Sequence, residues 1–365
     1  MLSQGSRQPN RLSHSRLTLE AIGESGWLER VGRMLGAPAG APPALPLAGV
    51  VVGFGDDAAC LAVGDRLVLV TTDVLIEGTH FTRRTIAPGA LGEKAVAVNV
   101  SDIAAMGGRP TALTVGLGAH GGLPVTWLEA VFAGMARACR RWGIAFAGGD
   151  TVRSERVVLA VTLLGEFDGP AERLPLRRRI RAGQRLYVTG TLGDSGAGLA
   201  LLQGGRPKAR GIETWRGELI ARHQRPVPRL AEGQALVRAF DDLAMIDLSD
   251  DLWKSVNLMA EAGGVGIGIQ TARLPLSGAL RRFARATGGP ALEQAVFGGE
   301  DFELLFATAA APQAVALSLG KAGLKTPVRA IGRATADRRV RWLDRAGREV
   351  KWEGRAFEHF GRREE

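Results

Sequence analysis

The chain of 365 residues has few cysteines, only Cys60 and Cys139, and a single tyrosine. The cysteines form no CxxC pair and have no neighbouring histidine, which argues against a disulfide framework or a zinc site. We expect both to be reduced thiols in the core. Residues 1–16 are polar and basic without the apolar region of a signal peptide, and no apolar run is long enough to cross a bilayer. These absences predict a cytoplasmic protein with no membrane partner.

Familiar nucleotide-binding motifs are absent as well. The chain contains neither the P-loop pattern GxxxxGK[ST] nor the HRD and DFG motifs of protein kinases, and the glycine-rich turn at residues 189–198 does not match the dinucleotide spacing GxGxxG. A glycine-rich turn at residues 189–198 resembles a phosphate-binding turn before a helix, although such a turn alone is weak evidence. We expect Asp194 and Ser195 to cap that helix. An ATP enzyme with this sequence would need another architecture.

The chain is basic, with 47 Lys and Arg against 37 Asp and Glu, a net charge of +10. Such a balance permits nucleic-acid binding, because clustered cations release the counterions of phosphates. The excess is scattered arginine, however, and the one dense run, residues 177–181, precedes a strand. No helix-turn-helix, zinc-finger or RNA-binding aromatic pattern is present. We therefore expect no nucleic-acid partner, and a basic nucleic-acid-binding protein is the non-enzyme alternative.

Six acidic clusters are spread along the chain, and we expect each where a strand meets a loop. They occupy residues 55–57, 71–73, 99–102, 148–151, 247–251 and 298–301. Aspartate and glycine are common in turns and helix caps, so one cluster alone indicates little. Carboxylates at the ends of buried strands are costly to desolvate unless a cation or hydrogen-bond donors meet them. Because Mg²⁺ prefers carboxylate, water and phosphate oxygens, the pattern predicts metal-assisted phosphate chemistry.

Hydrophobic periodicity and the positions of glycine and proline predict an α+β protein. We expect a flexible tail at 1–16, an N-terminal ATP- and metal-binding and dimerisation domain at 17–168, a linker at 169–185 and a C-terminal domain at 186–365. Helices are predicted at 18–36, 89–106, 124–142, 196–202, 216–240 and 312–322, with a further helix opened by the cluster at 247. Strands are predicted at 50–54, 66–72, 156–167, 186–189, 328–333 and 339–343, with another ending at 148–150. A surface loop is expected at 37–47.

Seven motifs in order resemble those of the thiamine-monophosphate kinases, in the superfamily of aminoimidazole ribonucleotide synthetase-like ATP enzymes. They read GFGDDAA, TTDVLIEGTHF, KAVAVNVSDIAAMGG, GGDTVRS, TGTLGDSGAGLALL, DLSDDL and FGGEDFELLF. The resemblance covers nearly the whole chain. It implies a two-domain fold of that superfamily, with mixed β-sheets flanked by helices, and a homodimer formed through the N-terminal domains. It also implies ATP-dependent phosphorylation of thiamine phosphate to thiamine diphosphate, with several Mg²⁺ ions and ATP as co-substrate.

The resemblance assigns site residues through these motifs. The implied Mg²⁺ ligands are Asp56, Thr71, Thr72, Asp73, Asp102, Asp150, Asp247 and Asp250. The implied ATP-binding residues are Phe132, Gly149, Asp150, Arg177 and Ser249. The implied thiamine phosphate-binding residues are His80, Glu300 and Phe357. Ordinary core or surface roles remain open for His80, Phe132, Phe357 and Arg177, and Asp57, Asp301 and Glu303 could either support the site or form turns.

Phosphate chemistry explains why metal ligands matter more here than a catalytic acid or base. A phosphate monoester has a second pKa near about 6, so the acceptor oxygen is already largely ionised at neutral pH. Two unit charges about 4 Å apart repel by roughly 4 kcal/mol at an effective dielectric constant of 20. Mg²⁺ ions offset this repulsion and align the groups. We therefore assign no acid, base or phosphoenzyme residue.

The chain departs from the family at Asp251, because the family usually has glycine there. Asp tolerates a left-handed turn better than most residues, but it adds a negative charge beside the predicted metal ligands. An extra cation ligand, a solvent-facing side chain and a damaged site are all open alternatives. Another enzyme of the superfamily is the alternative function, although the reactive N-terminal cysteine or selenocysteine expected of a selenophosphate synthetase is missing.

Overall fold

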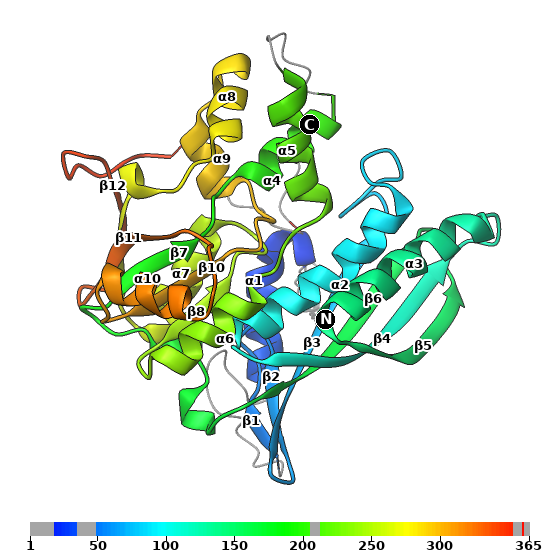
Figure 1. Cartoon of the computed structure of the whole chain (residues 1–365), viewed down its shortest axis with the longest axis horizontal. Coiled ribbons are helices and arrows are strands. Elements are labelled where there is room, and N and C mark those ends of the chain that lie inside the picture. The colour runs from blue at the N-terminus through cyan, green and yellow to red at the C-terminus, as the bar shows by residue number, and fades with distance from the viewer. Residues whose placement is uncertain (1–17, 35–48, 205–211, 353–359, 361–365) are drawn as a thin grey trace, which may run out of the picture.

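The computed structural model describes residues 18–34, 49–204, 212–352 and 360 (Figure 1). The predicted tail at 1–16, the predicted loop at 37–47 and Phe357 lie outside these residues. The described chain forms two six-stranded mixed sheets flanked by helices, which confirms the predicted α+β class. Cys60 and Cys139 are free and buried, as predicted. In the part of the chain that the structure describes, no helix combines the length and apolar character needed to span a membrane.

The first sheet has the strand order β1-β2-β3-β6-β4-β5. Its strands are β1 (Val50–Val52), β2 (Ala59–Val63), β3 (Arg66–Ile76), β4 (Arg109–Ala119), β5 (Ala145–Arg153) and β6 (Val158–Phe167). All neighbouring pairs are antiparallel except β4 and β5, which are parallel. Residues alternate along β6 between buried Leu159, Val161 and Leu163 and less buried residues between them, so one face of this sheet carries the core.

The second sheet has the strand order β12-β9-β11-β7-β10-β8. Its strands are β7 (Arg185–Thr189), β8 (Ala244–Asp247), β9 (Gly266–Gln270), β10 (Leu304–Thr308), β11 (Val328–Thr335) and β12 (Val340–Leu343). Only β12 and β9 run parallel. The strands β7 and β10 and the edge strand β8 are almost wholly buried, as expected for strands covered on both faces.

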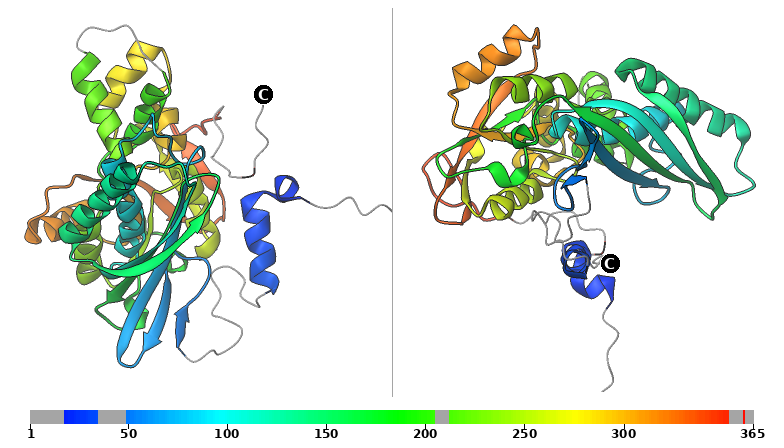
Figure 2. Two further views of the ribbon diagram at one scale, coloured as in Figure 1. Left: turned by 90° about the vertical axis from the view of Figure 1, so that its right-hand side faces the viewer. Right: turned by 90° about the horizontal axis from the view of Figure 1, so that it is seen from below.

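Helices cover both sheets (Figure 1). They are α1 (Leu19–Met34), α2 (Pro88–Ala105), α3 (Val125–Trp142), α4 (Asp194–Leu202), α5 (Ile212–Gln224), α6 (Leu230–Ala239), α7 (Leu252–Gly263), α8 (Gly278–Thr287), α9 (Ala291–Phe297) and α10 (Pro312–Lys321). Short 3₁₀ turns occupy Ala171–Arg173, Arg177–Arg179 and Thr271–Arg273. The views in Figure 2 show α1 set off to one side of the body.

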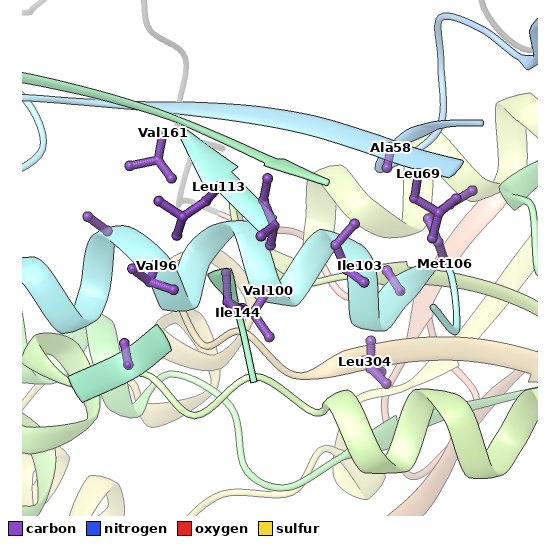
Figure 3. Packing of buried hydrophobic residues seen from close by; sticks show 14 of the residues in the cluster. Ala58, Leu69, Val96, Val100, Ile103, Met106, Leu113, Ile144, Val161 and Leu304 are labelled. Atoms are coloured by element: carbon purple, nitrogen blue, oxygen red, sulfur yellow. The ribbon is translucent and has the colours of Figure 1, made fainter. Parts of the chain in front are cut away.

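The helix α2 is the central element, because it packs between the two halves. Val96, Val100 and Ile103 lie on it, between residues of the first sheet, such as Leu113, and Leu304 of β10 (Figure 3). A helix buried on nearly all sides must be apolar all round, and α2 is apolar except for Lys94 and a few polar residues. This position brings its polar residues to the junction between the sheets.

Several predicted elements differ from the structure. The single helix predicted at 216–240 is two helices, α5 and α6, because Pro226 and Pro228 cannot continue a helix. The strands β3 and β5 extend beyond Asp73 and Asp150, so these two acidic clusters lie within strands and not at their ends. The cluster at 99–102 lies inside α2, as the predicted helix implied.

Candidate active site

Three carboxylates meet at the junction between the two sheets. Asp57 follows β1, Asp102 lies near the end of α2, and Asp247 ends β8. Each offers a carboxylate oxygen that lies within 4.8 Å of the other two. We call Asp57, Asp102 and Asp247 the acidic cluster. It draws residues from both halves of the chain, so it forms only when the two halves are packed together.

Hydroxyl groups orient two carboxylates of the acidic cluster. Thr71 Oγ1 donates a hydrogen bond to Asp102 at 2.5 Å, and Ser101 Oγ donates to Asp247 at 2.6 Å. The Asp57 side chain is only 1% exposed, and its Oδ2 atom has no hydrogen-bond partner among the described residues. A buried, unpartnered carboxylate oxygen in an all-oxygen donor set fits a hard divalent cation such as Mg²⁺.

Burial and mutual repulsion disfavour the ionised forms of these acids. Burial, together with the charges of Asp57 and Asp73, raises the pKa of Asp247 to about 8. Burial and the charge of Asp250 raise the pKa of Asp73 to about 6. The pKa of Asp102 is also raised well above its usual value, by burial and by Asp73 and Asp247. A cation in this place would relieve the repulsion and favour the ionised carboxylates.

Arg177 supplies one positive charge to this region. Its guanidinium donates to Asp57 Oδ1 at 2.5 Å, and its backbone N–H donates to Asp56 Oδ1 at 2.8 Å. The structure therefore places Asp57, not Asp56, in the acidic cluster, while Asp56 contacts the backbone of Arg177. The two acids are neighbours in GDD, and only the course of the backbone after β1 distinguishes them. Sequence reasoning left Asp57 open for that reason.

Asp73 and Asp250 form a second acidic pair beside the acidic cluster. The charge of Asp250 raises the pKa of Asp73, and the charge of Asp73 in turn raises the pKa of Asp247. The backbone N–H of Asp73 donates to Asn99 Oδ1 at 3.2 Å, which connects β3 to α2. Asp250 pairs with Lys254 Nζ at 2.8 Å. Ser249, next to Asp250, is exposed. Five acids from distant segments thus converge, of which the motifs assigned Asp73, Asp102, Asp247 and Asp250 and left Asp57 open.

Thr72 and Asp150 are not brought to the acidic cluster. Thr72 lies opposite Thr162, with 2.9 Å between their hydroxyl oxygens, on the face of the first sheet that Asp73 does not share. Asp150 pairs in register with Gly116 of β4, on that same face. Since β6 and β4 separate β5 from β3, Asp150 lies about 14 Å from β3.

Phe132 and Gly149 lie near the β5 edge of the first sheet. Phe132 of α3 packs beside Phe146 of β5, with ring centroids 6.1 Å apart. Gly149 has φ 159°, and a Cβ there would overlap the carbonyl oxygen of Val115, so only glycine lets β5 approach β4 this closely. In a single chain, β6 and β4 separate the strand beside these residues from β3.

Glu300 precedes β10, with its backbone in the left-handed region at φ 54°. Its carboxylate pairs with Lys94 Nζ at 2.9 Å and with His223 Nδ1 at 3.2 Å. Burial alone would raise the pKa of Glu300, but Lys94 and His223 lower it to about 2. His80 follows β3, and its Nδ1 accepts a hydrogen bond from the backbone N–H of Ile76 at 3.0 Å.

The remaining acids of these motifs have structural partners. Asp251 has φ −136°, an extended backbone, and its carboxylate caps α7 by accepting from the Lys254 N–H at 2.7 Å. Asp301 accepts from the N–H groups of Gly193 and Ser195 at the start of α4. The prediction that Asp194 and Ser195 cap this helix is wrong, because Asp301 reaches those N–H groups from another segment.

Glu303 is fully buried and binds Arg222, Arg229 and Thr189. It therefore ties β10 to α5 and to the segment before α6.

Comparisons with known proteins agree with this geometry. The model of the AIR synthase related protein N-terminal domain matches residues 55–167, and that of the C-terminal domain matches residues 181–344. The chain is 37% identical over 316 residues to the thiamine-monophosphate kinase of Salmonella typhimurium, which covers 85% of this chain and 92% of the relative. It is 39% identical over 253 residues to the thiamine-monophosphate kinase of Aquifex aeolicus, covering 69% of this chain and 79% of that one.

Solved structures show the same relationship. AaThiL complexed with AMPPCP and TMP has a TM-score of 0.79 and 32% identity, and the match covers 94% of this chain and 99% of that one. The hydrogenase maturation protein HypE of E. coli, at 23% identity and a TM-score of 0.61, shares the fold. The chain therefore belongs to the AIR synthase related protein family and, within it, to the thiamine-monophosphate kinases.

Proposed function

We propose that this protein transfers the γ-phosphoryl group of ATP directly to thiamine phosphate, giving thiamine diphosphate, with Mg²⁺ assistance. The kinase family and the likeness to AaThiL, which was complexed with AMPPCP and TMP, support the reaction. The observation that carries the metal-assisted mechanism is the acidic cluster, three carboxylates within 4.8 Å at the domain junction. Carboxylates gathered so closely are expected where a protein holds cations against phosphates.

The metal-binding residues come from both halves. Asp57 joins the proposed ligands because its buried Oδ2 lacks a partner among the described residues. The others are those assigned by the motifs, Asp56, Thr71, Thr72, Asp73, Asp102, Asp150, Asp247 and Asp250. When bound, Mg²⁺ would neutralise phosphate charge and favour in-line transfer. Ser101 and Thr71 keep Asp247 and Asp102 oriented through their hydroxyls.

The proposed nucleotide and acceptor residues are those assigned by the motifs. We assign ATP to Phe132, Gly149, Asp150, Arg177 and Ser249. We assign thiamine phosphate to His80, Glu300 and Phe357. Arg177 suits a phosphate because its planar guanidinium can bind two oxygens, and Glu300 suits an amino group or a cation because its carboxylate is held ionised.

The open face of the first sheet supports the proposed homodimer. Val74, Val152 and Leu164 are exposed apolar residues there, and Thr72 and Asp150 lie among them. The helices α2 and α3 pack on the opposite face (Figure 2). A second copy covering this face would bury apolar surface and enclose both proposed site residues. We further propose a cytoplasmic location and two domains, at 17–168 and 186–365, joined by 169–185.

The decisive experiment measures thiamine diphosphate formation from thiamine phosphate and ATP, with and without Mg²⁺, in the native protein and in Asp73→Asn and Asp57→Asn. Residues that merely orient metal ligands cost about 10- to 100-fold when removed, so loss of a ligand should cost at least as much. Asp65→Asn, in the exposed turn between β2 and β3, is the matched control and should retain activity. A folded native protein that binds ATP but forms no product would point to another acceptor within the superfamily.

A further inference from the structure

Glu300 is held by two buried cationic or polar side chains from different halves of the chain. Lys94 lies on α2 in the first half, whereas Glu300 precedes β10 in the second, and the two residues are 206 positions apart. The Lys94 side chain is 2% exposed and the His223 side chain 5%, but Glu300 is 30% exposed. Of the three, only Glu300 therefore offers substantial surface to a ligand.

The contacts fix the orientation of the Glu300 carboxylate. Lys94 Nζ lies 2.9 Å from Oε1 and 3.0 Å from Oε2, so one ammonium group bridges both oxygens. His223 Nδ1 lies 3.2 Å from Oε2 and also 3.2 Å from Ser195 Oγ. Because an ionised carboxylate only accepts hydrogen bonds, the proton of His223 must be on Nδ1. The carboxylate plane is thus set from two directions.

The backbone of Glu300 is fastened to the segment that carries the proposed metal and nucleotide residues. Its N–H donates to the carbonyl oxygens of Ser249 at 2.9 Å and Asp250 at 3.0 Å. Gly299 has φ 66°, and a Cβ there would overlap the carbonyl oxygen of Asp250, so this approach requires glycine. Glu300 therefore keeps a fixed position relative to Asp247 and Asp250.

The same helix holds both ends of the site. Lys94 and Asp102 are eight residues apart on α2, which corresponds to about 12 Å along the helix axis. Lys94 meets Glu300 at one end, and Asp102 joins the acidic cluster at the other. An extended acceptor with a phosphate at one end and a polar ring at the other could contact both places.

We propose that Lys94 and His223 are positioning residues that hold the Glu300 carboxylate to accept a hydrogen bond from the amino group of the acceptor's aminopyrimidine ring. This inference rests on the proposed function. Lys94 is too buried to touch the acceptor, so it acts through Glu300. The amino group would donate a hydrogen bond to the fixed carboxylate of Glu300. A phosphate ester without such a donor would leave this carboxylate without that hydrogen bond, so the site would favour thiamine phosphate.

The test compares Lys94→Met with the double variant Lys94→Met/Glu300→Gln. Methionine has nearly the length of lysine without its charge, so Lys94→Met leaves the negative charge of Glu300 without its Lys94 partner. The double variant replaces this carboxylate with a neutral amide, so its thermal stability should recover relative to the single variant. We expect the KM for thiamine phosphate to rise about 10- to 100-fold in both variants. The KM for ATP should change less than about twofold.

A purely structural role for Lys94 gives a different pattern. In that case Lys94→Met lowers the thermal stability but leaves the KM for thiamine phosphate at the native value, or both KM values rise together, and either result overturns the inference. Arg137→Met, an exposed ion-pair partner of Glu93 beside α2, is the control and should leave both KM values unchanged. Native protein that forms no thiamine diphosphate overturns the proposed function and this inference with it, whereas active native protein with unchanged KM values overturns the inference alone.

Discussion

At the scale of single residues, Asp251 serves the fold from a position beside the proposed metal ligand Asp250. Its backbone is extended at φ −136°, so the position does not require the conformational freedom of glycine. Its carboxylate accepts from the N–H of Lys254 at 2.7 Å and satisfies the first turn of α7. The departure from the family pattern therefore adds a helix cap.

Asp251 variants separate a capping role from metal binding. Asp251→Ala removes the cap and should lower the free energy of unfolding by about 1 kcal/mol. Asp251→Asn keeps an oxygen that can cap α7 but loses the charge, so it should retain both the stability and the Mg²⁺ dependence of the native protein. Urea unfolding and the Mg²⁺ concentration for half-maximal activity measure the two effects. A large loss of Mg²⁺ affinity in Asp251→Asn would make Asp251 a metal ligand instead.

Asp301 predicts a dependence of stability on pH. Burial and the charge of Asp194 raise its pKa to about 7, although the hydrogen bond from the Gly193 N–H lowers it. The unfolded value is about 3.9, so the folded protein holds the proton over the range between the two values. Its contribution to stability is complete below about pH 4 and is lost as the pH rises through about 7.

Asp301→Asn should remove this part of the pH dependence. The asparagine cannot ionise, yet its carbonyl oxygen can still accept from the start of α4. We expect the free energy of unfolding to fall less between pH 5 and pH 8 in the variant than in the native protein, with urea unfolding at both pH values as the measurement. Equal slopes for the two proteins would show that the Asp301 charge is paired in the fold after all.

At the scale of elements, α2 and α3 owe their close contact to glycine. A Cβ at Gly92 would overlap the carbonyl oxygen of Val131, and a Cβ at Gly134 would overlap that of Gly89. Because the atoms in the way belong to the backbone, no flexible side chain could move aside to make room for a Cβ. This contact fixes α2, and with it Lys94 and Asp102, against the first sheet.

Two glycine-to-alanine variants in helices should change stability in opposite directions. Alanine favours a helix over glycine by about 1 kcal/mol, but at Gly92 it forces α2 and α3 apart, at an overpacking cost of about 1–3 kcal/mol or more. Gly92→Ala should therefore destabilise the protein. Gly217→Ala in α5, where a Cβ meets no atom within 4 Å, should stabilise it by about 0.5–1 kcal/mol. Urea unfolding measures the free energy of unfolding of both variants. An increase in Gly92→Ala would contradict the close packing of α2 against α3.

The sequence predicted long periodic elements better than short buried ones. The helices α2, α3 and α10 begin and end within two residues of their predicted bounds, because apolar spacing, proline and glycine all agree there. The strands β2, β4, β8, β9 and β10 were not predicted. Short buried strands such as β8 and β10 lack the alternation that marks a half-exposed strand, because every residue in them is buried.

For the site, the sequence predicted residues better than their contacts. Motifs assigned Asp73, Asp102, Asp247 and Glu300 to the site. They could not show that Asp57 lies with Asp102, or that Thr72 and Asp150 lie on the other face of the sheet, because those facts depend on strand register. The contact of Lys94 with Glu300 has no local signal at all, since it joins residues 206 positions apart.

At the scale of the whole molecule, the site exists only where the two halves meet. Ser101 of α2 donates to Asp247 of β8, and Lys94 of α2 pairs with Glu300, so each contact joins one half to the other. A rotation of one half against the other would separate Asp102 from Asp247 and Lys94 from Glu300 together. Metal binding and acceptor binding are therefore expected to stabilise the same packed arrangement.

The open face of the first sheet predicts the state of assembly. Val152 on β5 is 56% exposed and lies on the face that α2 and α3 leave uncovered, beside Asp150. If a second copy covers this face, Val152→Arg places a charge in a buried apolar contact and should convert the dimer to a monomer, as measured by light scattering after size-exclusion chromatography. Leu317→Arg, at an equally exposed apolar position of 59% on α10, is the matched control and should leave the mass unchanged. A native protein that is monomeric at micromolar concentration would contradict the dimer. A Leu317→Arg variant that dissociates equally would show that the contact does not depend on this face.

Because Thr72 and Asp150 lie on the same face, a monomeric Val152→Arg protein should also bind ATP more weakly, while its acidic cluster, on the covered side, keeps its geometry.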